Sequence, residues 1–126
     1  MQLNDKTIII TGASSGIGET AAVLFAAEGA NLLLGARRET LLQQLATKIN
    51  DSWGSAVCLA GDVRDEAFAD DLVQLAEANF GGLDGAFNNA GMMGDTVAVP
   101  DMETANWKEV IATNLTSAFF AAKYQI

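Results

Sequence analysis

The sequence predicts an α/β fold with a doubly wound parallel sheet, and three observations support this prediction. Short apolar or β-branched runs alternate with longer segments whose apolar residues recur at helical spacing. A glycine-rich turn, TGASSGIG at Thr11–Gly18, directly follows the first apolar run. The 126 residues, 50% of them hydrophobic, suffice for one domain with a single core. Because crossover helices would separate successive strands, we expect those strands to run parallel.

Two strand–helix units are predicted in the first half of the chain. Lys6–Thr11 (KTIIIT) and Asn31–Ala36 (NLLLGA) have the compact apolar pattern of buried strands. One helix is expected over residues 17–29, where Gly29 ends it, and another over residues 39–50. The apolar face of the first helix is predicted to comprise Ile17, Ala21, Leu24 and Phe25. That of the second helix is predicted to comprise Leu41, Leu42, Leu45 and Ile49.

The second half repeats this alternation. Ala56–Val63 (AVCLAGDV) is a predicted third strand, and Leu83–Gly91 (LDGAFNNAG) is a fourth strand that runs into a turn. Between them, Asp65 is the expected N-cap of a helix that Gly81–Gly82 ends. The apolar residues of this helix are Phe68, Leu72, Val73 and Ala76. After a loop with Pro100, a last helix is predicted with an apolar face that includes Trp107, Val110, Ile111, Leu115 and Phe119. The sheet should therefore contain about four strands.

The charge and composition of the chain argue against several classes of partner and site. A net charge of −9, with only seven Lys and Arg, disfavours nucleic acid and anionic membranes as partners. Because there is no histidine and only one cysteine, Cys58, we expect neither an internal disulfide nor a metal site. No basic and apolar leader and no apolar run of membrane-spanning length is found, and we expect a cytoplasmic protein.

The turn at Thr11–Gly18 has the chemistry of a phosphate-binding loop. Gly12, Gly16 and Gly18 would let the chain turn sharply and start a helix against the strand. Backbone N–H groups and the positive end of that helix could then approach a pyrophosphate, which a side chain at Gly16 or Gly18 would obstruct. The alternative is that these glycines only form a tight turn. Their position between a strand and a helix favours phosphate binding.

Four motifs, taken together and in this order, resemble those of the short-chain dehydrogenase/reductase family. They are TGASSGIG at Thr11–Gly18, GDV at Gly61–Val63, NNAG at Asn88–Gly91 and TNL at Thr113–Leu115. The resemblance implies a Rossmann-like NAD(P)-binding domain over residues 1–126. It also implies hydride transfer between the nicotinamide and an alcohol or carbonyl substrate. The glycine order G-x-x-x-G-x-G and the NNAG motif disfavour a methyltransferase that uses S-adenosylmethionine.

The resemblance implies a role for each of these motif residues. The cofactor's phosphates would be cradled by Gly12, Ser14, Ser15, Gly16, Ile17 and Gly18. Asp62 would accept a hydrogen bond from the adenine amine, and Val63 would donate its backbone N–H to the ring. Asn89, Ala90 and Gly91 would lie beside the nicotinamide ribose, whereas Asn88 would help to hold the fourth strand. The alternatives are a solvated carboxylate at Asp62 and a purely structural role for NNAG.

The residues that follow the second strand favour NADP over NAD. An acidic residue there would accept the ribose hydroxyls and repel a 2′-phosphate, but Ala36 is neutral. Arg37 and Arg38 supply guanidinium groups suited to phosphate, and we expect Arg37 to be the principal contact with Arg38 in support. In the alternative, both arginines only begin the second helix in solvent. A shifted loop could instead bring Glu39 to the ribose and favour NAD.

The family's chemistry needs a tyrosine, a lysine four residues later, a serine and an asparagine that holds a water in the proton relay. Asn114 matches the asparagine, whereas the other three are expected beyond Ile126. Tyr124 follows Lys123 directly and lacks the required spacing, so both are expected to be ordinary helix residues. The chain is thus expected to be a truncated, cofactor-binding half of an oxidoreductase, inactive alone. The alternative is a non-catalytic module that binds a dinucleotide or a partner.

Two further expectations concern substrate and assembly. Met92, Met93 and Val97 make the segment after Gly91 apolar, which hints at a hydrophobic small-molecule substrate or simply at packing against other loops. An unpaired edge on the fourth strand and a partly uncovered last helix would favour association, so we expect a homo-oligomer.

Overall fold

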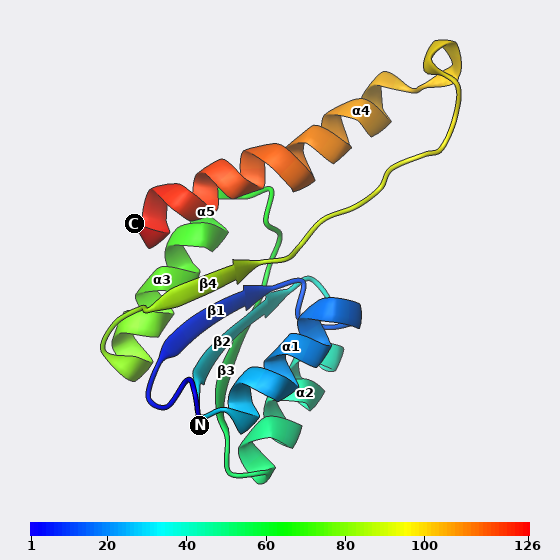
Figure 1. Cartoon of the computed structure of the whole chain (residues 1–126). Coiled ribbons are helices and arrows are strands. Elements are labelled where there is room, and N and C mark those ends of the chain that lie inside the picture. Colours follow the sequence, from blue (N-terminus) through cyan, green and yellow to red (C-terminus); the bar gives the residue numbers. More distant parts are fainter.

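A parallel sheet forms the centre of the molecule (Figure 1). The computed structural model describes residues 1–126. The strands are β1 (Thr7–Thr11), β2 (Asn31–Ala36), β3 (Ser55–Ala60) and β4 (Gly85–Asn88), in the spatial order β3-β2-β1-β4. All three strand pairs are parallel, which confirms the predicted α/β class and the four strands. β3 ends three residues earlier than predicted, because Gly61–Val63 leave the sheet, and β4 ends at Asn88, so that Asn89–Gly91 lie beyond the strand where its predicted exit was.

Helices cover both faces of this sheet. They are α1 (Gly16–Ala27), α2 (Glu39–Asp51), α3 (Glu66–Phe80), α4 (Thr104–Ile111) and α5 (Ser117–Gln125). A π-helical turn at Ala112–Thr116 joins α4 to α5, and a short 3-10 turn at Val99–Asp101 precedes α4. In Figure 1, α1 and α2 lie on one face, whereas α3 with α5 beside it lies on the other. The result is a three-layer arrangement in which neither face of β1 or β2 is open.

Alternating residues of β1 and β2 supply the core of each layer. Ile8, Ile10, Leu32 and Leu34 belong to the cluster beneath α1 and α2. Ile9 and Leu33 point the other way, into a cluster with Phe68 of α3. Because both faces are covered, the central residues of these strands, Ile8–Ile10 and Leu32–Leu34, form uninterrupted apolar runs rather than alternating apolar and polar ones.

The predicted apolar face of α1 is partly wrong. Ile17 is 73% exposed and Leu24 is 56% exposed, whereas Ala22 and Gly18 are buried. The helix GIGETAAVLFAA is apolar on nearly every side, so its periodicity does not define one face. Close packing of the small residues on the sheet turns the larger side chains outward. On α2, Leu42, Leu45 and Ile49 are buried as predicted, but Leu41 is 40% exposed.

The predicted ends of α3 are at the right residues, although one capping interaction differs. Asp65 is the N-cap residue, but its side chain makes no capping hydrogen bond. Its backbone carbonyl instead accepts a bond from the N–H of Phe68 at 3.2 Å. Gly81 ends the helix with φ 80° and donates its N–H to the carbonyl of Glu77, as a left-handed C-terminal glycine does.

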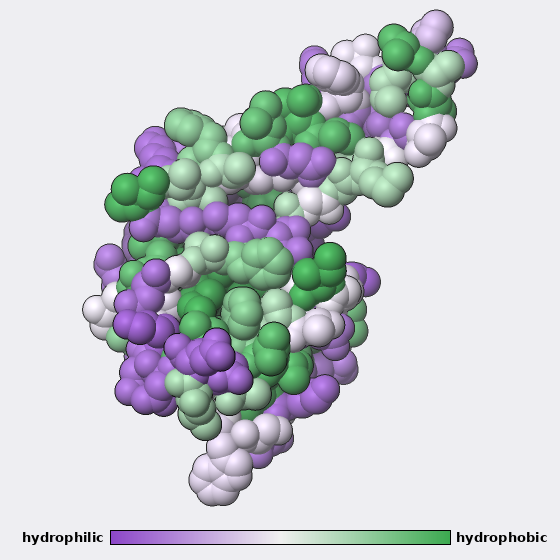
Figure 2. Space-filling model, viewed as in Figure 1, coloured by the Kyte–Doolittle hydropathy of each residue, from purple (hydrophilic) through white to green (hydrophobic).

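After β4 the chain leaves the body and forms a projecting arm of loop 89–103 and α4 (Figure 1). Figure 2 shows hydrophobic surface along this projecting part. Trp107, Leu115 and Phe119, which were expected on an apolar face, are each more than 60% exposed. β4 pairs with β1 alone, so it is an edge strand as expected. No helix of this chain has the length and apolar character needed to cross a bilayer.

Candidate functional site

A cavity of about 450 Å³ opens at the carboxyl ends of the strands. The chain passes outward from β1 to β2 and β3, then returns to place β4 on the other side of β1. This reversal makes the β1–β4 boundary the topological switch point, where α/β sheets form ligand crevices. Most of the predicted cofactor-binding residues line the cavity: Gly12, Ser14, Ser15, Arg37, Arg38, Asp62, Val63, Asn89, Ala90 and Gly91. Met92, Thr113, Ala36 and Gly61 complete the lining.

The three glycines of the first loop serve different purposes. A Cβ on Gly18 would lie 2.2 Å from the carbonyl oxygen of Gly12, so this glycine allows α1 to pack against the loop. Gly12 has φ 63°, and its Cβ would approach the backbone of Ala90 at 3.0 Å. Gly16 has φ 57° with no atom within 4 Å of its Cβ position. Gly18 thus has a steric reason within the protein, in line with the expected start of a helix against the strand, and the obstruction of a pyrophosphate by a side chain there stays a prediction.

The N-terminus of α1 has no side-chain cap. Ser15 occupies the N-cap position, and its side chain makes no hydrogen bond to the helix; its Oγ instead accepts a hydrogen bond from Nη2 of Arg38 at 3.1 Å. The first backbone N–H groups of a helix lack partners within it and carry the positive end of its dipole. Ile17 belongs to this first turn with its side chain in solvent. Gly16, Ile17 and Gly18 thus offer backbone donors, although none of them lines the cavity.

Both arginines predicted to recognise a phosphate lie at the cavity. Arg37 and Arg38 follow directly after β2 and have exposed side chains. Arg38 is the N-cap residue of α2, and its bond to Ser15 joins the end of β2 to the glycine loop. Glu39, the residue that could have favoured NAD, begins α2 and does not line the cavity. The charged side chains that line the cavity at the end of β2 are therefore the guanidinium groups of Arg37 and Arg38.

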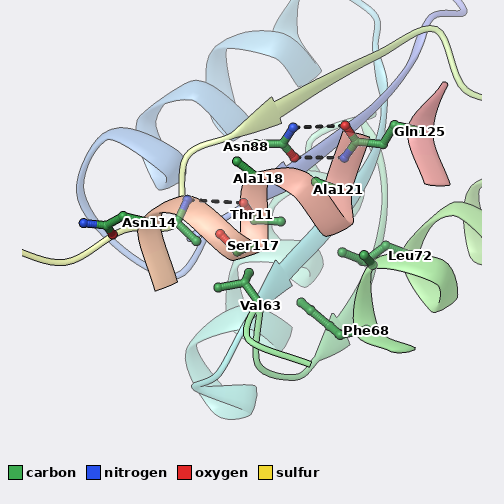
Figure 3. Close-up of a pocket in the computed structure, with 12 residues that line it drawn as sticks. Thr11, Val63, Phe68, Leu72, Asn88, Asn114, Ser117, Ala118, Ala121 and Gln125 are labelled. Carbon is green, nitrogen blue, oxygen red and sulfur yellow. Dashed lines mark hydrogen bonds between the residues drawn. The ribbon is translucent and has the colours of Figure 1, made fainter. Parts of the chain in front are cut away.

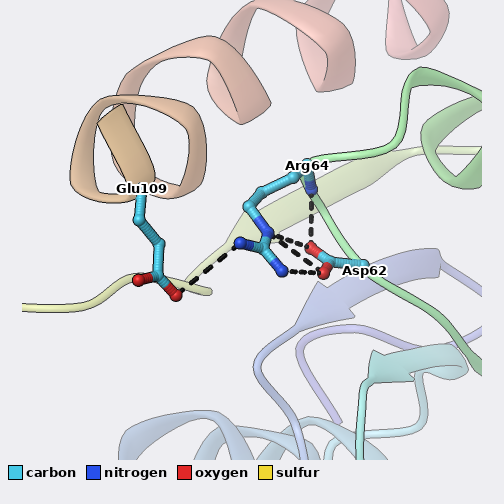
Figure 4. Close-up of polar contacts among 3 residues, drawn as sticks. All are labelled: Asp62, Arg64 and Glu109. Carbon is cyan, nitrogen blue, oxygen red and sulfur yellow. Dashed lines mark hydrogen bonds and ion pairs between the residues drawn. The ribbon is translucent and has the colours of Figure 1, made fainter. Parts of the chain in front are cut away.

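Asp62 is held by Arg64, a contact that sequence reasoning missed (Figure 4). Asp62 Oδ1 accepts from the backbone N of Arg64 at 2.9 Å and from Nε at 3.1 Å. Oδ2 accepts from Nε at 3.0 Å and from Nη2 at 2.7 Å. The hydrogen bond from the guanidinium holds the pKa of Asp62 below its usual value, and the charge of Arg37 acts in the same direction. Asp62 is therefore a carboxylate at neutral pH.

Asn89 and Ala90 fasten the turn after β4 to the end of β1. The side-chain amide of Asn89 donates to the carbonyls of Thr11 and Gly12 at 3.3 and 3.4 Å. The backbone N–H of Ala90 donates to Oγ1 of Thr11 at 3.2 Å. These bonds give the NNAG motif a structural role in addition to its position at the cavity. Thr11, which is buried, was not among the predicted site residues.

Asn88 pairs with α5 rather than with a loop. Its side-chain amide exchanges two hydrogen bonds with that of Gln125, at 3.0 and 2.9 Å (Figure 3). This contact ties the end of β4 to the C-terminal helix. It agrees with the expected role of Asn88 in holding the fourth strand, although Gln125 carried no sequence signal.

Asn114 lies in the π-helical turn and contacts the loop after Gly91. Its Nδ2 donates to the carbonyl of Met92 at 2.6 Å, and its Oδ1 accepts from the N–H of Met92 at 2.8 Å. A second, smaller cavity of about 50 Å³ adjoins Asn114 and Ser117, as Figure 3 shows. Insertions of this kind in a helix are frequent at functional sites. The structure therefore places Asn114 next to the main cavity, with both side-chain polar groups bound to the backbone of Met92.

Comparisons with known proteins agree with this geometry. A family model described as short chain dehydrogenase matches residues 6–125. An uncharacterized oxidoreductase of Listeria innocua is 39% identical over 115 residues, which are 91% of this chain and 46% of the relative. An uncharacterized oxidoreductase of Staphylococcus aureus USA300 is 34% identical over 121 residues, or 96% and 51% of the two chains. This chain therefore spans about half the length of these relatives.

A solved structure gives the same result for the fold. The crystal structure of a "putative short-chain alcohol dehydrogenase" from Sinorhizobium meliloti 1021 is similar, with a TM-score of 0.89 and 35% sequence identity. The match covers 98% of this chain and 49% of that one. The similarity to these proteins thus covers nearly the whole chain and its fold, and not only the four motifs.

Proposed function

Because this chain belongs to the short-chain dehydrogenase family, we propose that it is the NADP(H)-binding part of an oxidoreductase acting on an alcohol or carbonyl compound. When bound, a nicotinamide cofactor gives or takes a hydride. The observation that supports this proposal best is the cavity at the switch point. Its lining brings together the glycine loop, two arginines, Asp62 and the NNAG turn from four separate strand ends.

The residues at the cavity fit the chemical parts of a dinucleotide. The uncapped start of α1, with Ser14 and Ser15, would bind the pyrophosphate. Asp62 and Val63 would bind the adenine, and the Asn89–Gly91 turn would bind the nicotinamide ribose. Each assignment pairs the hydrogen-bond donors and acceptors of one segment with those of the cofactor part that it would bind.

The preference for NADP over NAD rests on charge. Arg37 and Arg38 lie at the end of β2, where a 2′-phosphate would be recognised, and no carboxylate stands in that position because Ala36 is neutral. Guanidinium groups bind phosphate through paired, charge-assisted hydrogen bonds. We therefore propose that Arg37 and Arg38 together select the phosphorylated cofactor.

The acid–base chemistry is proposed to require groups outside residues 1–126. The single tyrosine, Tyr124, donates its O–H to Glu66 at 2.5 Å, and Lys123 pairs with the same carboxylate at 2.9 Å. Both contacts join α5 to α3, and neither residue lines the main cavity. We propose that Asn114 holds a water molecule in the proton relay. We expect this chain to bind cofactor without turnover.

A cofactor titration tests the proposal. The 126-residue chain is titrated with NADPH and, in parallel, with NADH, while the fluorescence of the reduced nicotinamide is followed. Saturable binding with the higher affinity for NADPH is the expected result. Binding of neither cofactor would contradict the proposed site. Equal affinities would contradict only the proposed role of the arginines.

A further inference from the structure

Trp53 is fully exposed to solvent and has a backbone conformation that favours glycine. Its φ is 67°, and it lies in the turn between α2 and β3, where Gly54 donates its N–H to the carbonyl of Ile49 at 3.0 Å. Glycine, or sometimes asparagine, usually stands at this position after a helix. A residue with a Cβ is unfavourable in the left-handed region, and an indole in water gains nothing from burial. The fold of one chain therefore gives no reason for a tryptophan here.

A groove of about 130 Å³ lies beside Trp53, between α1 and the C-terminal end of α2. Its apolar lining residues are Val23, Ala26, Ala27 and Ile49. Ser52 and Gly54, which precede and follow Trp53, also line it, and its only charged lining residue is Lys48. An apolar cavity of about 150 Å³ takes up one benzene molecule, and an ammonium group is attracted to the face of an indole. The groove thus has the size and the chemistry that an aromatic ring requires.

The groove and the exposed tryptophan belong to the same surface, which makes that surface complementary to itself. Trp53 does not occupy the groove of its own chain, because its side chain is 100% exposed. Two copies that face each other across a two-fold axis would each place Trp53 in the groove of the other, so that the same contact forms twice. Tryptophan is also among the residues that most often anchor protein interfaces. A second copy is therefore the occupant that these observations favour.

We propose that two copies of this chain form a transient dimer by exchanging Trp53 between their α1–α2 grooves. Two buried tryptophans, at about 150–250 Å² each, provide much less than the roughly 1,200 Å² of a stable interface, so the dimer should be weak. None of the groove residues lines the main cavity or belongs to α4 or α5. In Figure 1 the turn between α2 and β3 lies at the bottom, away from the projecting arm. The dimer therefore leaves the main cavity open and does not depend on the proposed function.

The test follows the exposure of Trp53 as the protein concentration rises. The chain has two tryptophans, so Trp107→Phe leaves Trp53 as the only one, and all variants below carry this substitution. Quenching of Trp53 fluorescence by acrylamide should fall severalfold between about 10 μM and about 1 mM protein, as the indole moves from water into a groove. Higher salt should strengthen this protection, because it screens the repulsion between copies that each carry a net charge of −9.

Two variants remove the two halves of the contact separately. Trp53→Asn removes the indole and supplies a residue that tolerates the left-handed region, so it should be at least as stable to urea as the parent. Ala27→Gln fills the groove from an exposed position at the end of α1. Neither variant should dimerise in sedimentation experiments. Leu24→Gln is the matched control, because Leu24 is an exposed residue of α1 outside the groove lining, and it should dimerise like the parent.

A mixture of the two variants gives the decisive result. Trp53 of the Ala27→Gln copy should enter the free groove of the Trp53→Asn copy, so its fluorescence should become protected in the mixture but not in Ala27→Gln alone. The inference would be overturned by a Trp53 that stays exposed at every concentration of the parent. Protection that does not change with concentration would also overturn it, because the indole would then lie against its own chain. Equal quenching in the mixture and in Ala27→Gln alone would exclude the exchange between grooves.

Discussion

The side-chain amide of Asn114 forms a reciprocal pair with the backbone of Met92, donating to its carbonyl and accepting from its N–H. The two residues are 22 positions apart. This pair joins the π-helical turn to a residue that lines the main cavity. The position of the loop therefore depends on the same side chain that is proposed to act in catalysis.

Removal of this pair should loosen the loop. We expect Asn114→Ala to destabilise the fold by about 1 kcal/mol, because both bonds are solvent-accessible and water replaces part of what is lost. Hydrogen exchange at the Met92 amide should accelerate. The control is Asn106→Ala on α4, whose Oδ1 accepts from the N–H of Asp95 in the same loop. That variant should expose the Asp95 amide and leave Met92 protected.

The two arginines after β2 should determine cofactor choice. Arg37→Ala and Arg38→Ala should each weaken NADPH binding by roughly tenfold or more, the effect of a lost charge-assisted contact. Binding of NADH should change little, because it has no 2′-phosphate. Fluorescence titrations with both cofactors measure the two affinities. Unchanged NADPH affinity in both variants would contradict the phosphate role.

Alanine substitutions at Gly18 and Gly16 should differ clearly in how much they lower the free energy of unfolding. A Cβ on Gly18 would lie 2.2 Å from the Gly12 carbonyl oxygen, so Gly18→Ala requires a shift of α1 or of the loop. We expect Gly18→Ala to lower the free energy of unfolding by about 3 kcal/mol or more, because the added methyl group overpacks the site and displaces the backbone. At Gly16 an added Cβ has no atom within 4 Å, so only the positive φ is unfavourable for alanine. We expect Gly16→Ala to lower the free energy of unfolding by about 1–2 kcal/mol. Urea unfolding of the two variants measures this difference.

The contact between α3 and α5 should make stability depend on pH at both extremes. The hydrogen bonds from Tyr124 and then Lys123 lower the pKa of Glu66, so its contribution is present above the ordinary glutamate value and is lost as pH falls through the lowered one. The bond to Glu66 raises the pKa values of Lys123 and Tyr124. Their contribution is therefore lost as pH rises through those raised values.

Glu66→Gln should remove both dependences. Chemical denaturation across pH, with Glu77→Gln at an exposed position of the same helix as the control, would detect the difference. The effect should be small, because the groups are exposed to solvent and to salt. A parent and a Glu66→Gln variant with the same pH profile would show that this contact contributes nothing to holding α5.

The buried strands were predictable from the sequence because local pattern and tertiary environment agree there. Ile9 and Leu33 lie in uninterrupted apolar runs, and only a strand covered on both faces buries such a run completely. The glycine loop was recognisable because its glycine spacing and its place between a strand and a helix are typical of a phosphate-binding loop. Most of the cavity lining could therefore be named from four short motifs.

The remaining features depend on contacts that no local pattern encodes. α1 is apolar on most sides, so the exposure of Leu24 followed from how the small residues pack on the sheet. The pairs Asn114–Met92 and Asn88–Gln125 join residues far apart in the sequence. The bond from Arg64 to Asp62 spans only two residues, but either side chain alone reads as a solvated charge. Such pairings arise from the fold, which sequence periodicity describes only in part.

Self-association is proposed because α4, the π-helical turn and α5 expose large apolar side chains and the sheet has an open edge. Trp107, Leu115 and Phe119 are 62–64% exposed, and β4 has a strand partner on one side only. A second copy that covers this surface would remove large apolar side chains from water, at about 25 cal/mol for each Å² of apolar area buried. Light scattering at increasing concentration should therefore show a species larger than the monomer.

Charged substitutions test which surface mediates this association. Leu115→Glu and Phe119→Glu should each shift the equilibrium toward monomer, because burial of an unpaired carboxylate is costly. The matched control is Leu24→Glu on α1, where a leucine is 56% exposed on a helix that covers the other face of the sheet. If Leu24→Glu dissociates the assembly and Leu115→Glu does not, association proceeds through α1. A parent chain that stays monomeric at high concentration would instead mean that these exposed residues do not drive association between copies.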